Sequence, residues 1–163
     1  RGEDWQRSLR LRRAGHLVWL DPQLQVVYWP RDTWAKLARQ FTATGIWRGE
    51  LVRRAGGRHP LRYFAPPALL VASALSLVLL VLELTRIVTG PLALVLSLVY
   101  LAPVLYAALL LALLLLRSSG ERLRDRATFA MVIAVMHYSW GAGFLRGVLL
   151  GARDAVDRSR IES

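Results

Sequence analysis

The sequence of 163 residues contains no cysteine. This absence excludes a disulfide framework, a thiolate metal site and a cysteine nucleophile, and it leaves the redox compartment open. Acidic residues are also few, with 11 Asp and Glu against 22 Lys and Arg, so the formal net charge is +11. Any chemistry in this chain therefore rests on carboxylates, amides, arginines and aromatic rings.

The apolar part of the sequence lacks helical or strand periodicity and stands in blocks, although hydrophobic residues make up 55% of the chain. Residues 64–82 carry almost no polar group, and about 19 helical residues nearly cross a hydrocarbon core of roughly 30 Å. After a polar link, residues 83–90, the block Pro91–Leu116 is long enough to cross again. These blocks argue against a soluble globule and predict an integral membrane protein with a transmembrane hairpin over residues 64–116.

Prolines and glycines in the apolar blocks predict how the helices pack. The pair Pro66-Pro67 fits the first turn of a membrane helix. Pro103 lies inside the second block, where its missing N–H frees a carbonyl that a neighbouring helix or a local kink must satisfy. Further along, glycines recur every four residues at Gly143, Gly147 and Gly151. This spacing favours the close approach of one helix face to another backbone.

The distribution of charge predicts the orientation. Residues 1–63 hold 13 of the 22 Lys and Arg, residues 117–126 hold four, and the link between the two blocks holds only Arg86. By the positive-inside tendency, the N-terminal region and the 117–126 loop are cytoplasmic in a multi-pass protein of the cell membrane. The same positions explain the basic charge without nucleic acid, so membrane lipids are the expected partner.

The third apolar block, residues 127–145 within a final segment 127–163, leaves two interpretations open. It is long enough to cross, but it contains His137-Tyr138-Ser139-Trp140 and is followed by Arg146 and three further arginines. A crossing places these four arginines outside, whereas a re-entrant or interfacial segment keeps them in the cytoplasm. The fold class expected is mainly α, with two or three transmembrane helices.

The first 31 residues predict mixed local structure. A short helix from about Asp4 to Ala14 ends at Gly15, and an extended pair, residues 17–20 and 25–29, follows. The sequence starts without methionine and without an apolar signal segment, so we expect a fragment or a trimmed product.

Residues 32–63 predict an amphipathic interfacial helix and a juxtamembrane segment. Asp32 or Thr33 caps this helix, and its apolar positions share one face. The Gly45–Arg48 stretch is expected to turn. Five of the six tryptophans lie before residue 50, as expected for a region held at the level of the lipid headgroups.

The most informative stretch is Glu3–Gly15, in which the acidic pair Glu3-Asp4 opens a helix whose other polar positions are mostly basic. Read alone, the pair fits two roles. An Asp at a helix start satisfies free N–H groups, typically for about 1 kcal/mol, and two carboxylates there can also perform chemistry.

The stretch resembles the pattern Glu-Asp-x-Glu-Leu-x-x-Arg-Leu-x-x-Ala-Gly near the end of the catalytic domain in family 2 glycosyltransferases. It matches without a gap at Glu3, Asp4, Arg10, Leu11, Ala14 and Gly15. The likeness continues through Pro30-Arg31, Arg39-Gln40-Phe41, Gly45–Arg48, Ala65-Pro66-Pro67 and His137–Gly147. Within the family, the chain resembles the membrane-bound exopolysaccharide enzymes of the succinoglycan type.

The resemblance implies an inverting enzyme of the GT-A type, with residues 1–31 as a short α/β remnant of its catalytic domain. Asp4 is then the general base, Glu3 its partner, and Gln40, Trp47 and Arg48 contact the acceptor or the diphosphate. The substrates implied are a nucleotide sugar and a lipid-linked or polysaccharide acceptor.

The chain departs from the family pattern at Gln6, Arg7 and Ala43, which replace Glu, Leu and an arginine. The nucleotide-binding units and the Asp-x-Asp motif have no match in it, so the ligands of the divalent metal, Mg²⁺ or Mn²⁺, are expected elsewhere in the complete enzyme. This part alone is expected to be inactive. The alternative is a non-catalytic membrane anchor or assembly module, in which Glu3 and Asp4 only cap a helix.

Overall fold

The described part of the chain is mainly helical and contains no strand. The computed structural model describes residues 3–19, 21–25, 27, 32–55, 59–115 and 122–152. The α-helices in these ranges are α1 (Glu3–Arg13), α2 (Trp34–Ala55), α3 (Ala65–Leu84), α4 (Gly90–Leu96), α5 (Leu101–Leu115) and α6 (Leu123–Leu150). Two 3-10 turns, η1 (Leu61–Tyr63) and η2 (Ser97–Tyr100), precede α3 and α5.

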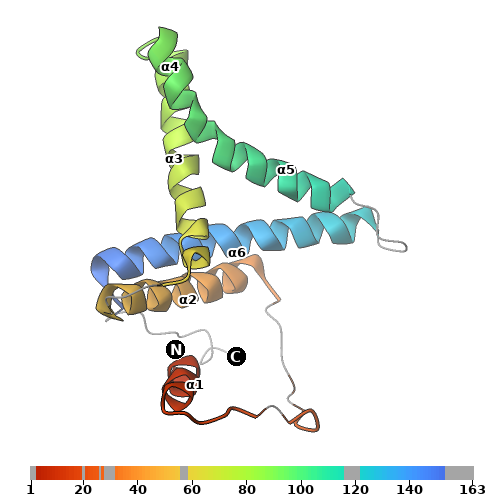
Figure 1. The fold of residues 1–163 in the computed structure, drawn as a ribbon. Coiled ribbons are helices and arrows are strands. Elements are labelled where there is room, and N and C mark those ends of the chain that lie inside the picture. Colours follow the sequence, from red (N-terminus) through yellow and green to blue (C-terminus); the bar gives the residue numbers. More distant parts are fainter. Residues whose placement is uncertain are drawn as a thin grey trace.

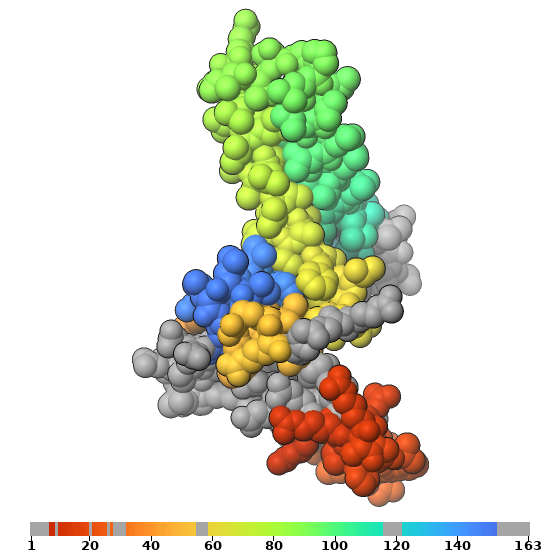
Figure 2. Space-filling view, turned by 60° about the vertical axis from the view of Figure 1, so that its left-hand side comes forward, coloured from red at the N-terminus to blue at the C-terminus, as the bar shows by residue number. Residues whose placement is uncertain are grey.

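The helices form a hairpin that stands on a crosswise base (Figure 1). Helix α3 rises away from the base, α4 lies at its far end, and η2 and α5 return obliquely. Helix α6 runs across the foot of α3 with α2 along its side, and α1 lies beyond α2. Figure 2 shows the same order from another side, with the hairpin projecting from the α2 and α6 pair.

Three of the described helical stretches are long and apolar enough to cross a membrane. They are α3 with 20 residues, Gly90–Leu115 with 26 residues and α6 with 28 residues. Most large apolar side chains of the hairpin are exposed, as Leu94 at 75% and Leu105 at 65% illustrate. Such a surface requires lipid around it, which confirms the prediction of a membrane protein at the level of its helices.

The predicted extended pair is wrong in the part that the structure describes. Residues 17–19, 21–25 and 27 form no strand, while residues 20, 26 and 28–31 lie outside the described ranges. Leu17 is 97% exposed and Trp19 is 88% exposed, so no described element covers these two side chains. A two-stranded hairpin is marginal without a third strand or a helix against it, and the α/β remnant is therefore not supported.

Helix α1 ends as the sequence predicts. Gly15 has a φ of +84°, which an L side chain rarely adopts. The N–H of His16 donates to the carbonyl of Leu11 at 3.0 Å, and the N–H of Gly15 donates to that of Arg12 at 3.2 Å. These two bonds form the Schellman arrangement that satisfies the last carbonyls of a helix.

Helix α2 begins as predicted, but it continues further. The Oγ1 atom of Thr33 accepts a hydrogen bond from the N–H of Lys36 at 3.2 Å, so Thr33 is the cap. Asp32 pairs with Lys36 instead, with 3.0 Å between Nζ and Oδ1. The predicted turn at Gly45–Arg48 is wrong, because α2 runs through it to Ala55.

Packing against α6 explains why Gly45 and Gly49 do not end α2. A Cβ atom on Gly45 would collide with the backbone carbonyl of Trp140, and one on Gly49 with that of Phe144. Both glycines are buried. The missing side chains let the backbones touch, and this contact offsets the cost of about 1 kcal/mol per glycine in a helix interior.

The contact is reciprocal, because glycines of α6 meet the backbone of α2. A Cβ atom on Gly143 would collide with the carbonyl of Thr42, and one on Gly147 with the carbonyl of Ile46. The sequence therefore predicted the packing role of Gly143 and Gly147 correctly. Gly151 plays a different part, since it follows α6 with a φ of +80°.

The hairpin contains the bend expected at Pro103. Because Pro103 has no N–H, the carbonyl of Val99 loses its usual helical partner. The hydroxyl of Ser76, a buried side chain of α3, donates to this carbonyl at 3.2 Å. The turn η2 lies just before the proline, and α5 diverges from α3 after it (Figure 1).

We expect Gly143→Val to destabilise the protein, because the added side chain must push the α2 backbone away. Overpacking typically costs about 1–3 kcal/mol, which corresponds to a fall in Tm of roughly 2–12 °C for a chain of this size. Tm is measured by differential scanning fluorimetry in detergent. Ala142→Val, at the exposed neighbouring position, is the control and should match the wild type. Equal Tm values for both variants would contradict the role of this contact.

Candidate functional site

The backbone of the acidic pair lies in the first turn of α1, as expected. The side chains of Glu3 and Asp4 lie outside the part of the chain that the structure describes. Their position at a helix N-terminus is favourable for negative charge, because the free N–H groups and the helix dipole stabilise a carboxylate there. This position is compatible with both interpretations of the pair, a cap and a catalytic role.

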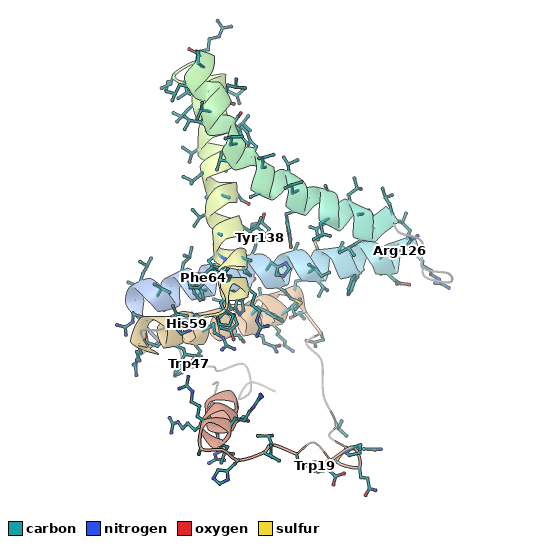
Figure 3. All side chains as sticks on the ribbon, viewed as in Figure 1. Trp19, Trp47, His59, Phe64, Arg126 and Tyr138 are labelled. Atoms are coloured by element: carbon teal, nitrogen blue, oxygen red, sulfur yellow. The ribbon has the colours of Figure 1, made fainter. Side chains whose placement is uncertain are left out.

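Gln40 and Trp47 share one face of α2. They are seven residues apart, which is close to two helical turns. The face that packs on α6 carries Thr42 and Ile46, so Gln40 and Trp47 lie on the opposite side. Figure 3 shows Trp47 on the side of α2 turned toward α1. Both side chains are partly buried.

Arg48 lies on another side of α2, against the turn that precedes α3. Its guanidinium carbon is 4.6 Å from the centre of the Tyr63 ring, and that of Arg62 is 5.7 Å from the same centre. A guanidinium at this distance is attracted to the ring face. The structure therefore brings Gln40 and Trp47 together, but it directs Arg48 toward Tyr63 instead of onto their face.

Sequence reasoning missed Glu50, which is the one buried acidic residue in the described ranges, at 3% exposure. Its carboxylate accepts hydrogen bonds from Arg53 at 2.8 and 3.0 Å, and it also pairs with Arg54. The signal was present, because acidic and basic residues three and four apart on a helix face each other. The hydrogen bond from Arg53 is the main reason why the pKa of Glu50 is lowered.

The end of α6 covers this ion pair. A Cβ atom on Gly151 would lie 3.1 Å from Oε2 of Glu50 and 3.2 Å from a guanidinium nitrogen of Arg53. Ala152 beside it is also buried, at 5% exposure. The Glu50 pair therefore anchors the C-terminal end of α6 on α2, which gives it a structural role.

A second polar cluster lies where α3, α5 and α6 meet. The hydroxyl of Tyr106 is 2.9 Å from Nδ1 of His137, and the hydroxyls of Ser73 and Tyr138 are 3.0 Å apart. The ring of Tyr106 also packs edge-on against Tyr138, with 6.0 Å between centroids. The hydrogen bond between Tyr106 and His137 therefore joins α5 to α6, and the one between Ser73 and Tyr138 joins α3 to α6.

Among the described residues, no three His, Asp or Glu side chains come close enough to hold a metal ion. The divalent metal that the family resemblance implies therefore has no ligand set in these ranges.

The chain is similar to a known polysaccharide biosynthesis protein. It is 28% identical over 148 residues to the succinoglycan biosynthesis protein ExoA of Rhizobium meliloti. The similarity covers 90% of this chain but 40% of that protein, so the chain spans less than half the length of its relative. No family model and no solved structure matches the sequence. This distant similarity supports the glycosyltransferase resemblance at the level of the family.

We expect Glu50→Gln to lower the folding stability at pH 7. The stability of the variant should also depend less on pH between 7 and 3 than that of the wild type. The pKa of Glu50 is lower in the folded than in the unfolded chain, whose value is near 4.5. As pH falls below 4.5, Glu50 is protonated first in the unfolded chain, so the contribution of its carboxylate to folding stability decreases. The decrease ends when the carboxyl of the folded chain is protonated too. Tm between pH 7 and 3 should therefore converge for the wild type and the variant.

Asp32→Asn is the control for this comparison, because it removes an ion pair whose carboxylate is 69% exposed. Exposed pairs contribute little, so its Tm at pH 7 should stay close to that of the wild type. A gap between Glu50→Gln and the wild type that persists unchanged to pH 3 would show that the pKa of Glu50 is not lowered by folding.

Proposed function

We propose that the chain is the C-terminal part of a membrane-bound glycosyltransferase, which transfers a sugar from a nucleotide donor to a lipid-linked or polysaccharide acceptor. The observation that carries the proposal is the similarity to a succinoglycan biosynthesis protein over 148 residues. It covers 90% of this chain, and the resemblance to family 2 glycosyltransferases also runs over nearly the whole chain. The agreement is supported by α1, which ends at Gly15 where the family pattern ends.

Asp4 is assigned as the general base. Its carboxylate takes the proton of the acceptor hydroxyl as that oxygen attacks the anomeric carbon, and the nucleoside diphosphate leaves with inversion. An aspartate with an ordinary pKa near 3.9 is ionised at neutral pH, and a positioned base typically contributes about 100- to 10,000-fold to the rate. Glu3, in the same turn of α1, is assigned as its partner.

The acceptor contacts are assigned to the face of α2 that carries Gln40 and Trp47. This face is turned toward α1, which carries the proposed base, and away from α6 (Figure 3). A tryptophan ring offers a flat apolar surface, and the amide of Gln40 offers one donor group and one acceptor group for hydroxyls. Arg48, which faces Tyr63, adds positive charge beside this face for the diphosphate.

The orientation proposed places α1 and α2 in the cytoplasm, where nucleotide sugars are made. The 13 Lys and Arg of residues 1–63 support this side. The divalent metal ion, Mg²⁺ or Mn²⁺, belongs to the proposal for the complete enzyme, where it supplies positive charge at the diphosphate. Its ligands would come from residues outside this chain.

We expect Asp4→Asn in the full-length protein to reduce sugar transfer by about 100- to 10,000-fold, because the amide cannot accept the proton. Transfer of radiolabelled glucose from UDP-glucose, and of other sugars from their nucleotides, to lipid extract is measured in membranes that contain equal amounts of protein. Asp21→Asn, an exposed acidic residue outside the helices, is the control and should keep full activity. Full activity of Asp4→Asn would favour the membrane anchor instead.

We expect Trp47→Ala to raise the KM for the acceptor by roughly tenfold, equivalent to about 1.4 kcal/mol of lost binding, with a smaller change in kcat. Loss of uniform binding has this signature because ground state and transition state lose the same contact. Trp34→Ala, at the exposed start of α2, is the control. An unchanged KM for the acceptor together with an unchanged kcat would show that Trp47 does not contact the acceptor.

A further inference from the structure

Helix α2 carries too much charge to lie in the hydrocarbon core. Its 22 residues include six charged side chains: Lys36, Arg39, Arg48, Glu50, Arg53 and Arg54. Each charge at the centre of a bilayer costs about 2.5–3.5 kcal/mol even on the mildest scale. Three of them, Arg39, Arg53 and Arg54, are exposed. Helix α2 therefore lies at the membrane surface or beyond it.

Helix α6 is bound to α2 along its C-terminal half. The four glycine contacts place Gly143 and Gly147 directly on the backbone of α2, and Gly151 covers the Glu50 pair. Helices whose backbones touch over several turns must run side by side at the same depth. The segment of α6 from Trp140 to Leu150 therefore also lies at the membrane surface, although its composition alone would permit a crossing.

The hairpin gives a second, independent indication of depth. A Cβ atom on Gly141, past the middle of α6, would lie 2.7 Å from the carbonyl oxygen of Pro66, at the start of α3. Helix α6 begins at Leu123, shortly after α5 ends at Leu115. The start of α3 and the end of α5 are the two feet of one hairpin, so they lie on the same side of the membrane. Helix α6 joins these two feet (Figure 1).

We propose that α6 does not cross the membrane. It lies along the cytoplasmic surface of the membrane, with α2 on one side and the lipid of that leaflet on the other. Its lipid contacts are at the boundary between the headgroups and the acyl chains. Only α3 and the Gly90–Leu115 stretch cross. The inference does not depend on the proposed enzyme activity, because it rests on helix packing and charge.

The side chains of α6 fit this position. Met131 and Leu149 are 56% and 76% exposed, and their spacing of about five helical turns puts them on one side of α6, where they would contact the acyl chains. Basic residues stand near both ends of the helix, with Arg124 and Arg126 at one and Arg146 at the other. A crossing helix would place one of these groups outside, against the positive-inside tendency, whereas an interfacial helix keeps both with the anionic leaflet.

The test is the sidedness of single cysteines, which the native sequence allows because it contains none. Asp32→Cys, Thr89→Cys, Arg122→Cys and Ser163→Cys are made one at a time in the full chain. They mark the start of α2, the tip of the hairpin, the start of α6 and the sequence after it. A membrane-impermeant maleimide is then added to inside-out and to right-side-out vesicles.

We expect the maleimide to label three variants, Asp32→Cys, Arg122→Cys and Ser163→Cys, from the same side of the membrane. Each should be labelled at least tenfold faster in inside-out vesicles than in right-side-out vesicles. Thr89→Cys should show the opposite preference. Reaction of Ser163→Cys from the Thr89 side, wholly or in part, would overturn the proposal, because α6 would then cross.

As a second measurement on the unaltered chain, green fluorescent protein fused after Ser163 should fluoresce, whereas alkaline phosphatase in its place should be inactive. The reverse result also overturns it.

Discussion

The backbone contact between α2 and α6 is the constraint on which the rest of the structure depends. Glycines on both helices remove the side chains that would hold the backbones apart, and each helix fills the space that the other leaves. Small residues serve this purpose among membrane helices because hydrophobic burial gives no advantage in lipid, and close van der Waals packing has to drive association. Here the glycine contacts join the apolar helix α6 to the charged helix α2.

This contact determines where the polar part of the chain lies relative to the hairpin. Helix α6 touches α3 at Gly141 and Pro66, and α2 touches α6 on another side. The α2 face with Gln40 and Trp47 is left turned toward α1 (Figure 3). In the proposed enzyme, the acceptor face is thus held at a fixed height above the membrane by two layers of backbone packing and not by a flexible link.

The sequence was sufficient where composition or local chemistry decides the structure. The apolar blocks predicted the hairpin, Gly15 the end of α1, and Pro103 a carbonyl that Ser76 satisfies from the neighbouring helix. It was insufficient where a distant partner decides. Gly45 and Gly49 resemble helix breakers until α6 is known to pack there, and the alternation in residues 17–29 predicted strands although no described element covers them.

The candidate site shows the same division. Residue spacing alone places Gln40 and Trp47 on one face, but only the structure shows that Arg48 turns to Tyr63 and that Glu50 is buried beneath Gly151. The acidic pair was identified through a family resemblance, which periodicity could not supply.

The glycine contact also sets an order of events during synthesis. The ribosome completes α2 first, then both legs of the hairpin, and α6 only afterwards. Until α6 is made, the Thr42–Gly49 face of α2 lacks the helix that packs on it. During this time α2 lies at the membrane surface, where its tryptophan and arginine side chains are favourably placed. Insertion of the hairpin can therefore finish before the base closes, and any defect in the last helix to emerge leaves an inserted but unassembled protein.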